Sequence, residues 1–526
     1  MRIHGKTLTS AIIAFACLTA AAQVTVPTYH YDNKRTGWNS HETSLTPANV
    51  TTKSFGLLHT VALDDQVDGQ PLVVPGVPIT AGPFSGTTHD VVYVATQGNT
   101  VYAIDVHTGA ILLSPNFGTP GSWPLGCNNN GPRVGITSTP VIDRAAAILY
   151  VMVYTQTGSV RDYTLHALDL GSLTDKVTPQ PVAASHTLSS GATFNFKANY
   201  QRQRPALLLH EGNVYAGFGS FCDFSANVSR GWLLGWNAPT LTPLPSNQLN
   251  DLQPRQSSGF FLSSIWMSGF GPATNEEGDI LFVTGNSNPG SYDGVSNIQE
   301  SVVKVSATLA NVLDLFTPKD QVFLDQEDND FGSGGVLVLP DQPGATPHLA
   351  VAAGKDGNLY LMDEDNLGGF SPHRNNVLGT YPIGGCWCGP SYYTAADGTG
   401  RIVASGGNNV SLYQVETAPK AALKFLKGSN SIPGSQNPGF FTVVSSNGPA
   451  NQIIWALSHP TGSGDNPIYL YAFDPNSGNS TMNTIFSAKA GFWPNFTGNS
   501  NLVPVVANGQ VFVASHKTLT IFGLRQ

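Results

Sequence analysis

The feature that most constrains this chain is a repeated phrase that runs along almost its whole length. The phrase has a small residue, a variable residue, proline and an apolar strand, with valine in place of proline in the fifth copy, and two further apolar strands follow after polar turns. A unit of this kind buries its faces against its neighbours, and a closed ring is the natural solution. The anchors of eight copies lie 54 to 69 residues apart, at Pro71, Pro140, Pro205, Pro272, Val336, Pro390, Pro449 and Pro504.

This spacing fits one four-stranded antiparallel sheet with its loops, so the sequence predicts an all-β fold, an eight-bladed β-propeller. We expect the segment near Phe55 to Leu63 to close the ring against the last blade. An array of β-sandwiches is the alternative, but it needs linkers, and the chain contains no Pro/Ser-rich or charged linker.

Composition agrees with short strands joined by tight turns. The 526 residues include 56 Gly and 36 Pro, and only 11% are charged. Glycine and proline at this frequency interrupt the chain every few residues, which favours turns over long helices. The formal net charge is -9 and basic runs are lacking, so nucleic acid and anionic membranes are not expected partners.

The first 22 residues are expected to be a signal peptide that is removed, which leaves 23–526 as a single propeller domain. Arg2, His4 and Lys6 precede the apolar stretch "SAIIAFACLTA", and "AAAQ" would allow cleavage after Ala22. A lipobox at Cys17 is the weaker interpretation, because alanine stands where leucine is usual. No later stretch is apolar enough for a membrane helix, so we expect a periplasmic or secreted protein.

Four cysteines follow the predicted cleavage site, and an exported protein can oxidise them. They are Cys127, Cys222, Cys386 and Cys388. Four thiols allow three pairings, and spacing alone does not choose between them. We expect a bond between Cys386 and Cys388, because no other cysteine shares their blade.

The clearest repeat, "YVATQGNTVYAIDVHTGAILL", resembles the blade repeat of quinoprotein dehydrogenases, which depend on pyrroloquinoline quinone. Ala103, Asp105, Thr108 and Gly109 match that repeat, whereas Leu113 replaces its tryptophan. The segment "DNKRTGWNSHETSLTPANVTTKSFGLL" is also similar to the N-terminal segment of that family. The resemblance implies an eight-bladed propeller, but non-enzymatic propellers share such repeats.

The resemblance also implies a set of site residues at one end of the channel. Asp68 in "DGQPLVV", Arg133 in "CNNNGPRVG", Trp266 in "SSIWMSGFGPA" and Trp387 in "GGCWCGP" stand where the family contacts its quinone. Lys355 in "AGKDGNLYLMD" matches the cation that faces the quinone oxygens.

The metal and the catalytic base follow from two further motifs. The family's Gly-x-Gly-Asn-Pro loop, whose asparagine binds Ca²⁺, resembles "TGNSNPG" and makes Asn286 a candidate ligand. Asp330 in "QEDNDFGSGG" stands at the catalytic aspartate and is a second candidate ligand. A hard cation prefers carboxylate and amide oxygens, and a neighbouring carboxylate can take the alcohol proton. The implied cofactors are therefore pyrroloquinoline quinone and Ca²⁺.

Several departures from the family fall in the same region. Asn128 follows Cys127 where the family has a second cysteine, and the calcium-binding glutamate falls at Cys222 or Asp223. Arg202 replaces a small threonine of the cofactor pocket. If the loops keep their places, the resemblance implies a Cys127–Cys222 disulfide that would occupy space the quinone needs.

Each candidate also has an ordinary structural interpretation. Asn286 and Asp330 are common turn residues, Trp266 and Trp387 could pack between blades, and "KDGN" at Lys355 fits a hairpin turn. Two functions from different classes therefore stand. One is a quinone-dependent dehydrogenase of alcohols or sugars, and the other is a non-catalytic propeller that binds a protein, glycan or small ligand.

Overall fold

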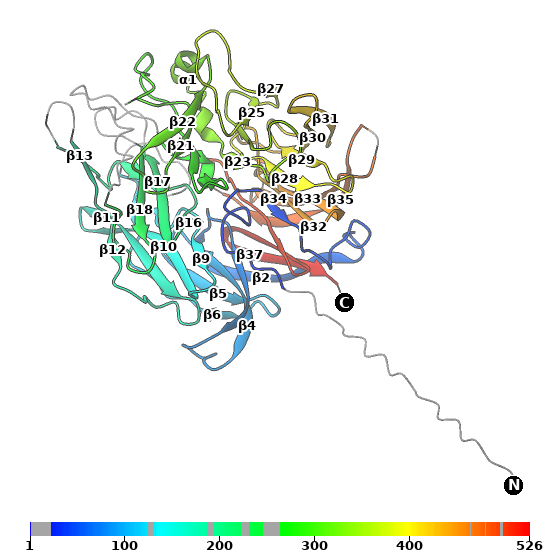
Figure 1. Cartoon of the computed structure of the whole chain (residues 1–526). Helices are drawn as coiled ribbons and strands as arrows, with labels where there is room; N and C mark the ends of the chain where they lie inside the picture. The colour runs from blue at the N-terminus through cyan, green and yellow to red at the C-terminus, as the bar shows by residue number, and fades with distance from the viewer. Residues whose placement is uncertain are drawn as a thin grey trace.

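The computed structural model describes Met1 and residues 23–525, apart from 125–130, 132, 188–190, 192, 222–230, 246–263, 296, 463, 479 and 495–497. The described chain forms an eight-bladed propeller of mainly four-stranded antiparallel sheets, as predicted. Figure 1 shows the blades following one another around the ring in chain order, from blue to red. No helix of the described residues is long and apolar enough to cross a membrane.

The first four blades contain the following strands. They are β3 (Leu72–Pro78), β4 (Thr88–Ala95), β5 (Val101–Asp105) and β6 (Ile111–Leu113); β9 (Val141–Asp143), β10 (Ile148–Thr157), β11 (Val160–Asp169) and β12 (Gln180–Pro181); β15 (Gln201–Arg202), β16 (Leu208–His210), β17 (Asn213–Ser220) and β18 (Trp232–Asn237); and β19 (Ala273–Thr274), β20 (Ile280–Val283), β21 (Val302–Val305) and β22 (Val312–Thr317).

The remaining four blades contain β23 (Val336–Val338), β24 (Leu349–Ala353), β25 (Asn358–Asp363) and β27 (Gly379–Pro382); β28 (Ser391–Thr394), β29 (Gly400–Ala404), β30 (Ser411–Glu416) and β31 (Ala422–Gly428); β32 (Thr442–Asn447), β33 (Ala450–Leu457), β34 (Pro467–Asp474) and β35 (Asn483–Phe492); and β36 (Val505–Ala507), β37 (Gln510–Leu524) and β2 (Phe55–Gln66).

Smaller elements lie outside this repeat. They are β1 (Trp38–Asn39), β7 (Gly121–Ser122), β8 (Arg133–Val134), β13 (Ser185–Thr187), β14 (Thr193–Asn195), β26 (Gly369–Phe370), the helix α1 (Gln321–Glu327) and 3₁₀ turns at Met267–Gly269 and Phe331–Ser333. The sequence analysis predicted no helix at α1, where one short amphipathic turn sits in a loop between blades.

The strands are apolar on both faces because each blade is covered by a neighbour on either side. All five residues of β5 are buried, and β4 pairs with β5 so that Tyr93 lies opposite Ala103. Strands buried on both faces read as continuous apolar runs rather than alternating ones. This explains why the repeat is visible in the sequence as apolar triplets.

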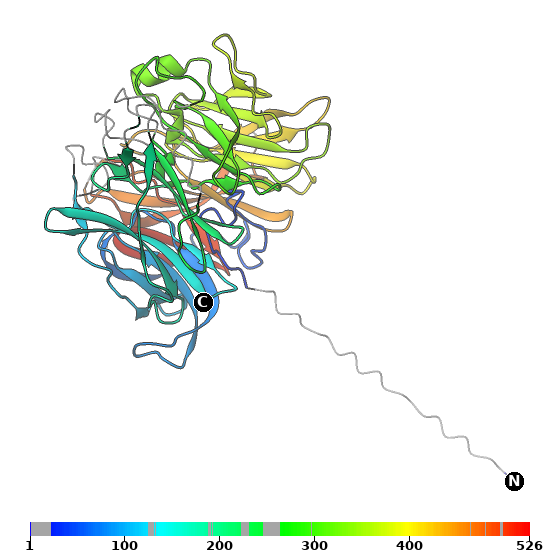
Figure 2. The ribbon, with the colours of Figure 1, turned by 60° about the vertical axis from the view of Figure 1, so that its left-hand side comes forward.

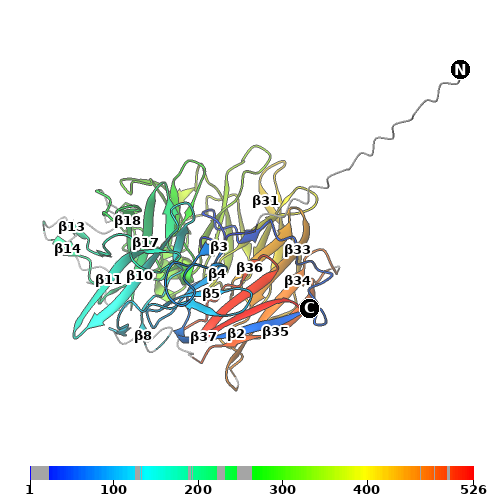
Figure 3. The same cartoon turned by 90° about the horizontal axis from the view of Figure 1, so that it is seen from below.

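The N-terminal strand β2 closes the ring. It pairs antiparallel with β37 from Phe55 opposite Leu524 to Gln66 opposite His516, so the first and last parts of the chain share one sheet. Figure 3 shows the red β37 beside the blue β2. The expected closing segment near Phe55 to Leu63 is confirmed.

One predicted anchor is wrong. Pro449 does not precede the innermost strand of its blade but lies in the turn between β32 and β33, where Asn447 pairs with Ala450. The innermost strand is β32, "TVVSSN", seven residues earlier than the anchor implied. The sequence "NGPAN" carries the same residue types as the true anchors, because tight turns also select Gly and Pro.

Residues 26–39 lie against the innermost strands of the blades, and we call this segment the N-terminal plug. Its backbone oxygens accept hydrogen bonds from strand after strand, for example Pro27 from Ile142 (2.8 Å) and Lys34 from Val338 (3.0 Å). Figures 1 and 2 show this dark blue segment against strands of several blades. Further bonds bring the plug to all eight innermost strands, at Val73, Ile142, Leu209, Thr274, Val338, Tyr392, Val444 and Val506.

Arg35 holds the plug from within. Its side chain is fully buried and donates to the carbonyl oxygens of Pro272 (2.8 Å), Tyr29 (3.0 Å) and Leu207 (3.3 Å). Burial lowers the pKa of Arg35 to about 10, which leaves it charged at neutral pH. Backbone carbonyls thus solvate this buried cation, and the charge of the nearby Asp32 carboxylate also favours its charged form.

Candidate functional site

The predicted site residues lie at the end of the channel where the innermost strands begin. Trp266, Asp330 and Trp387 precede β19, β23 and β28, respectively. Asn286 and Lys355 follow β20 and β24, which run antiparallel to the innermost strands of their blades. Antiparallel pairing brings these five residues to the same end, and we call them the mouth cluster.

An ion pair between Asp330 and Lys355 lies at the centre of the mouth cluster. Lys355 Nζ lies 2.6 Å from Asp330 Oδ2 and 3.1 Å from Asp328 Oδ1. The Asp330 side chain is 1% exposed and that of Lys355 is 9% exposed. Asp330 Oδ1 accepts a hydrogen bond from the backbone N–H of Asn286 (2.8 Å), and Asn286 Nδ2 donates to Asp328 Oδ1 (3.0 Å).

Gly285 allows this close approach. A Cβ atom at residue 285 would lie 2.6 Å from Asp330 Oδ1 and 2.9 Å from Trp266 Nε1. Both distances are shorter than any ordinary contact to a methyl group. The absence of a side chain at Gly285 is therefore required for Asp330 and Trp266 to share this space.

Two tryptophans flank the ammonium group of Lys355. Its Nζ atom lies 5.5 Å from the centre of the Trp266 ring and 5.3 Å from the Trp387 ring. Cations are attracted to the faces of indole rings at such distances. Both tryptophans therefore contact the ion pair as well as their own blades.

The carboxylates around Lys355 hold their protons differently. Burial alone would raise the pKa of Asp330, but the adjacent Lys355 ammonium holds it below its usual value. Burial and the charge of Asp330 raise the pKa of Asp328. Burial raises the pKa of Asp325 to about 7 and that of Glu300 well above its usual value. Asp330 is thus the member of this group that is most readily ionised at neutral pH.

Sequence reasoning missed Glu300, which lies beside Asp330. It is fully buried, has a left-handed backbone with φ of 51°, and accepts a hydrogen bond from the N–H of Phe331 through Oε2 (2.5 Å). Glu300 Oε1 and Asn286 Oδ1 are buried acceptors without a hydrogen-bond partner. Nothing in "NIQESVV" indicates a buried acid, because its environment comes from a neighbouring loop.

The donor set near Asp330 fits a hard cation. Asn286 offers an amide oxygen, and Glu300, Asp328 and Asp330 offer carboxylate oxygens. Among the described residues, the Oδ1 atom of Asn286 and the Oε1 atom of Glu300 have no hydrogen-bond partner. A cation bound between them would supply one. Oxygen-only donors of this kind suit Ca²⁺ better than a thiolate-preferring metal.

Asp68 and Arg133 also precede innermost strands, β3 and β9, but they bond to residues outside the mouth cluster. Asp68 Oδ2 accepts hydrogen bonds from Gln97 (2.5 Å) and Gln66 (3.1 Å), and Arg133 forms an ion pair with Asp65 (2.5 Å). Within the described ranges, neither forms a hydrogen bond or an ion pair with Asp330 or Lys355. The Arg133 side chain is 47% exposed and its charge is already balanced by Asp65.

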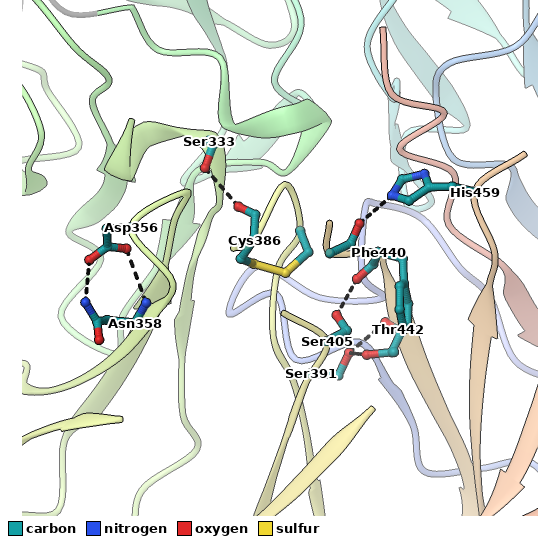
Figure 4. Close-up of a disulfide and its surroundings, with 11 residues drawn as sticks. Ser333, Asp356, Asn358, Cys386, Ser391, Ser405, Phe440, Thr442 and His459 are labelled. Atoms are coloured by element: carbon teal, nitrogen blue, oxygen red, sulfur yellow. Dashed lines mark hydrogen bonds between the residues drawn. A yellow bond between two sulfur atoms is a disulfide. The ribbon is translucent and has the colours of Figure 1, made fainter. Parts of the chain in front are cut away.

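A disulfide joins Cys386 to Cys388, the pair expected from the sequence, with Cα atoms 4.9 Å apart. Figure 4 shows it beside Ser333, whose hydroxyl donates to the Cys386 carbonyl (2.8 Å). This contact ties the loop that carries Trp387 to the loop that follows Asp330. The predicted Cys127–Cys222 bond and the candidate ligand Asp223 lie outside the described residues.

No protein-family model and no curated protein matches this chain. Solved structures do match this chain. A quinohemoprotein alcohol dehydrogenase from Comamonas testosteroni is 15% identical, with a TM-score of 0.59 over 96% of this chain and 81% of the other. Alcohol dehydrogenase ADHIIG from Pseudomonas putida HK5 is 14% identical, with a TM-score of 0.60 over 95% and 80%.

A europium-containing methanol dehydrogenase is 11% identical, with a TM-score of 0.58 over 95% of this chain and 98% of the other. Identities this low establish a shared fold and leave chemistry to be argued from the site. The chain therefore has the fold of a quinoprotein dehydrogenase-like eight-bladed propeller.

Proposed function

We propose that the mouth cluster binds pyrroloquinoline quinone together with Ca²⁺, and that the protein oxidises a hydroxyl group of an alcohol or sugar. The observation that carries this proposal is the meeting of Trp266, Asn286, Asp330, Lys355 and Trp387. They come from three successive blades, and hydrogen bonds, an ion pair and cation–π contacts connect them.

Four oxygen donors would hold the cation. Asn286 Oδ1 and Glu300 Oε1 are buried without partners, and Asp330 and Asp328 add carboxylate oxygens. Glu300 would take the role of the glutamate that the sequence comparison placed at Cys222 or Asp223. A divalent cation would also offset the repulsion among these acids, which raises the pKa of Glu300 in addition to burial.

Trp266 and Trp387 would bind the flat cofactor, and Lys355 would face its oxygens. When bound, the quinone supplies an electrophilic centre that accepts a hydride from the carbinol carbon. Asp330 is ionised at neutral pH, so it can accept the hydroxyl proton at a carboxylate oxygen. Lys355 fixes the orientation of that carboxylate through the 2.6 Å contact to Oδ2.

Reconstitution with the quinone and Ca²⁺ tests this function. Binding is measured by quenching of tryptophan fluorescence and by cofactor absorbance, and turnover by alcohol-dependent reduction of an artificial electron acceptor. We expect Asp330→Asn to bind the quinone but to lose turnover by a factor of about 10² or more. Asp465→Asn, in an exposed pair with Lys489, is the matched control and keeps both properties. Failure of the wild-type protein to bind the quinone would refute the proposal.

A second candidate is a non-catalytic propeller that binds a protein, glycan or small ligand. It is favoured by Arg202 at a position where the related family has a small residue, and by the mutual neutralisation of Lys355 and Asp330. Ligand binding without any alcohol oxidation would support this candidate. Export is part of both proposals and rests on the N-terminal 22 residues. Detection of the mature protein starting at Gln23 outside the cytoplasm would test it.

A further inference from the structure

Two arginines beside the mouth cluster have no directly bonded carboxylate among the described residues. Arg202 ends β15 and Arg204 follows two residues later, close enough that the charge of Arg202 lowers the pKa of Arg204. Arg202 is 6% exposed, and its Nε and Nη2 atoms are buried without a hydrogen-bond partner. Throughout the described part of the chain, neither guanidinium forms a hydrogen bond or an ion pair.

Burying two guanidinium groups without bonded partners costs free energy. Burial lowers the pKa of Arg202, and burial together with the charge of Arg202 lowers the pKa of Arg204 to about 9. Buried cations in proteins are normally paired or fully hydrogen-bonded, because leaving water without compensation costs several kcal/mol. Asp68 is the carboxylate that favours both charged forms, but it receives hydrogen bonds from Gln97 and Gln66 instead.

Each guanidinium lies over an indole ring. Arg202 Cζ is 4.8 Å from the centre of the Trp123 ring, and Arg204 Cζ is 5.7 Å from the Trp266 ring. Trp266 also faces Lys355 at 5.5 Å. The indole rings hold the planar groups in place, and no described residue accepts a hydrogen bond from their N–H donors. The arginine pair and the mouth cluster thus share Trp266 as a common wall.

We propose that Arg202 and Arg204 form a carboxylate-binding subsite for a ligand whose flat or ring-shaped body lies against the tryptophans of the mouth. A guanidinium fork matches a carboxylate with two parallel hydrogen bonds. A neutral alcohol would leave the two cations uncompensated, so the subsite selects an acidic ligand over a neutral one.

The carboxylate could come from two sources. One is the quinone of the proposed function, which carries carboxylates, and in that case the inference rests on that function. The other is an acidic sugar such as a uronate, which needs no cofactor. The shared chemistry is a ring that bears a carboxylate, and the two sources are separated by testing each ligand alone.

Fluorescence titrations of the full protein test the subsite. The probes are pyrroloquinoline quinone with Ca²⁺, digalacturonate without the quinone, and glucose as a neutral control. The variants are Arg202→Gln, Arg204→Gln and Arg202→Lys. Arg144→Gln is the control, because Arg144 is exposed and donates only to the Pro75 carbonyl near the far end of β9.

We expect at least one acidic probe to bind, glucose not to bind, and each Gln variant to weaken acidic-probe binding about tenfold. Arg202→Lys should weaken acidic-probe binding nearly as much as Arg202→Gln does, since lysine lacks the planar guanidinium fork. Without ligand, Arg202→Gln should raise the melting temperature by roughly 1 to 2 °C, because an unpaired buried charge is removed. This gain also shows that the variant is folded.

Unchanged affinity of both Gln variants for every acidic probe would overturn the subsite, as would wild-type protein that binds no acidic probe. These outcomes separate the subsite from the proposed function. Alcohol oxidation that persists with unaltered quinone affinity in Arg202→Gln and Arg204→Gln would retain the function and remove the subsite. If the protein never binds the quinone but binds a uronate through both arginines, the subsite is retained and the proposed function is removed.

Discussion

The N-terminal plug and the mouth of the channel bury charge in different ways. In the plug, Arg35 is fully buried and donates to four backbone carbonyls and the Thr28 hydroxyl, so its positive charge is compensated by the protein itself. At the mouth, Arg202 keeps two buried donors without partners, and Asn286 and Glu300 each keep one buried acceptor without a partner.

This difference concerns the buried arginines, because the plug also keeps two buried polar atoms without a partner among the described residues, Tyr29 Oη and His30 Nε2. Buried polar groups that have hydrogen-bond partners fix one arrangement of the chain. Buried polar groups without partners cost free energy, and a ligand that bonds to them removes this cost. The plug bonds to all eight innermost strands, which leaves the mouth as the end where a ligand can meet the candidate residues. The predictions below test this contrast.

The largest effect is expected at the central ion pair. Lys355→Met leaves Asp330 buried without its cation, which should lower the free energy of unfolding by about 3 to 5 kcal/mol. The double variant Lys355→Met/Asp330→Asn should recover much of this loss, because no charge then remains unpaired. Reversible denaturant unfolding measures both. Lys489→Met, which breaks the exposed pair with Asp465, is the control and should have no measurable effect.

At the plug, Arg35→Met is expected to lower the free energy of unfolding by about 3 kcal/mol, because the carbonyls of Pro272, Tyr29 and Leu207 lose a donor. Adding ligand tests whether the plug, like the mouth, takes part in binding. Quinone with Ca²⁺ should stabilise the wild type and Arg35→Met to a similar extent. A selective loss of ligand stabilisation in Arg35→Met would mean that the plug takes part in binding.

The plug should also be sensitive to acid through His30. Burial lowers the pKa of His30 to about 3, so the folded protein keeps this ring neutral while the unfolded chain takes up a proton below about pH 6.5. The unfolded state then binds more protons, and the stability contributed by neutral His30 is lost as the pH falls from about 6.5 toward 3.

Replacement of His30 by Gln removes this titration. Between pH 7 and pH 4.5, the wild type should lose on the order of 2 kcal/mol more stability than His30→Gln, measured by unfolding at each pH. Parallel pH profiles for the two proteins would show that His30 does not contribute.

The smallest effect is expected for the Cys386–Cys388 disulfide. A ring this short removes little entropy from the unfolded chain, so Cys386→Ser/Cys388→Ser should cost about 1 to 2 kcal/mol. Because Trp387 lies between the two cysteines, its fluorescence should change even where stability hardly does. An emission spectrum identical to that of the wild type would show that the bond does not position Trp387.

Much of the mouth was accessible from the sequence because its residues fall in motifs beside the innermost strands. Trp266, Asn286, Asp330, Lys355 and Trp387 were all predicted as site residues, and the structure brings them together. Their positions follow from the repeat, since each motif has a fixed place relative to its strand. Asp68 and Arg133 were predicted by the same logic but form separate contacts with Gln97 and Asp65.

Other residues could not be assigned in this way. Glu300 and Arg204 lie outside any motif, and their roles depend on burial by neighbouring loops. The position of Pro449 was misread because a hairpin turn and a strand start select the same residues. The plug was visible only as a segment similar to a family's N-terminal region, with no sign of where it would lie.

The sequence by itself determined the eight blades and the closure of the ring by the segment that forms β2. Each repeat carries the apolar strands of one sheet within a short stretch of sequence, so each blade is specified by its own repeat. The tertiary structure alone decided which groups are desolvated and which of them meet. Arg202 with Trp123, Glu300 with the Phe331 amide, and Arg35 with carbonyls of different blades are contacts between segments distant in sequence. They exist only once the ring has closed, because closure both excludes water from the channel and fixes the distances between loops.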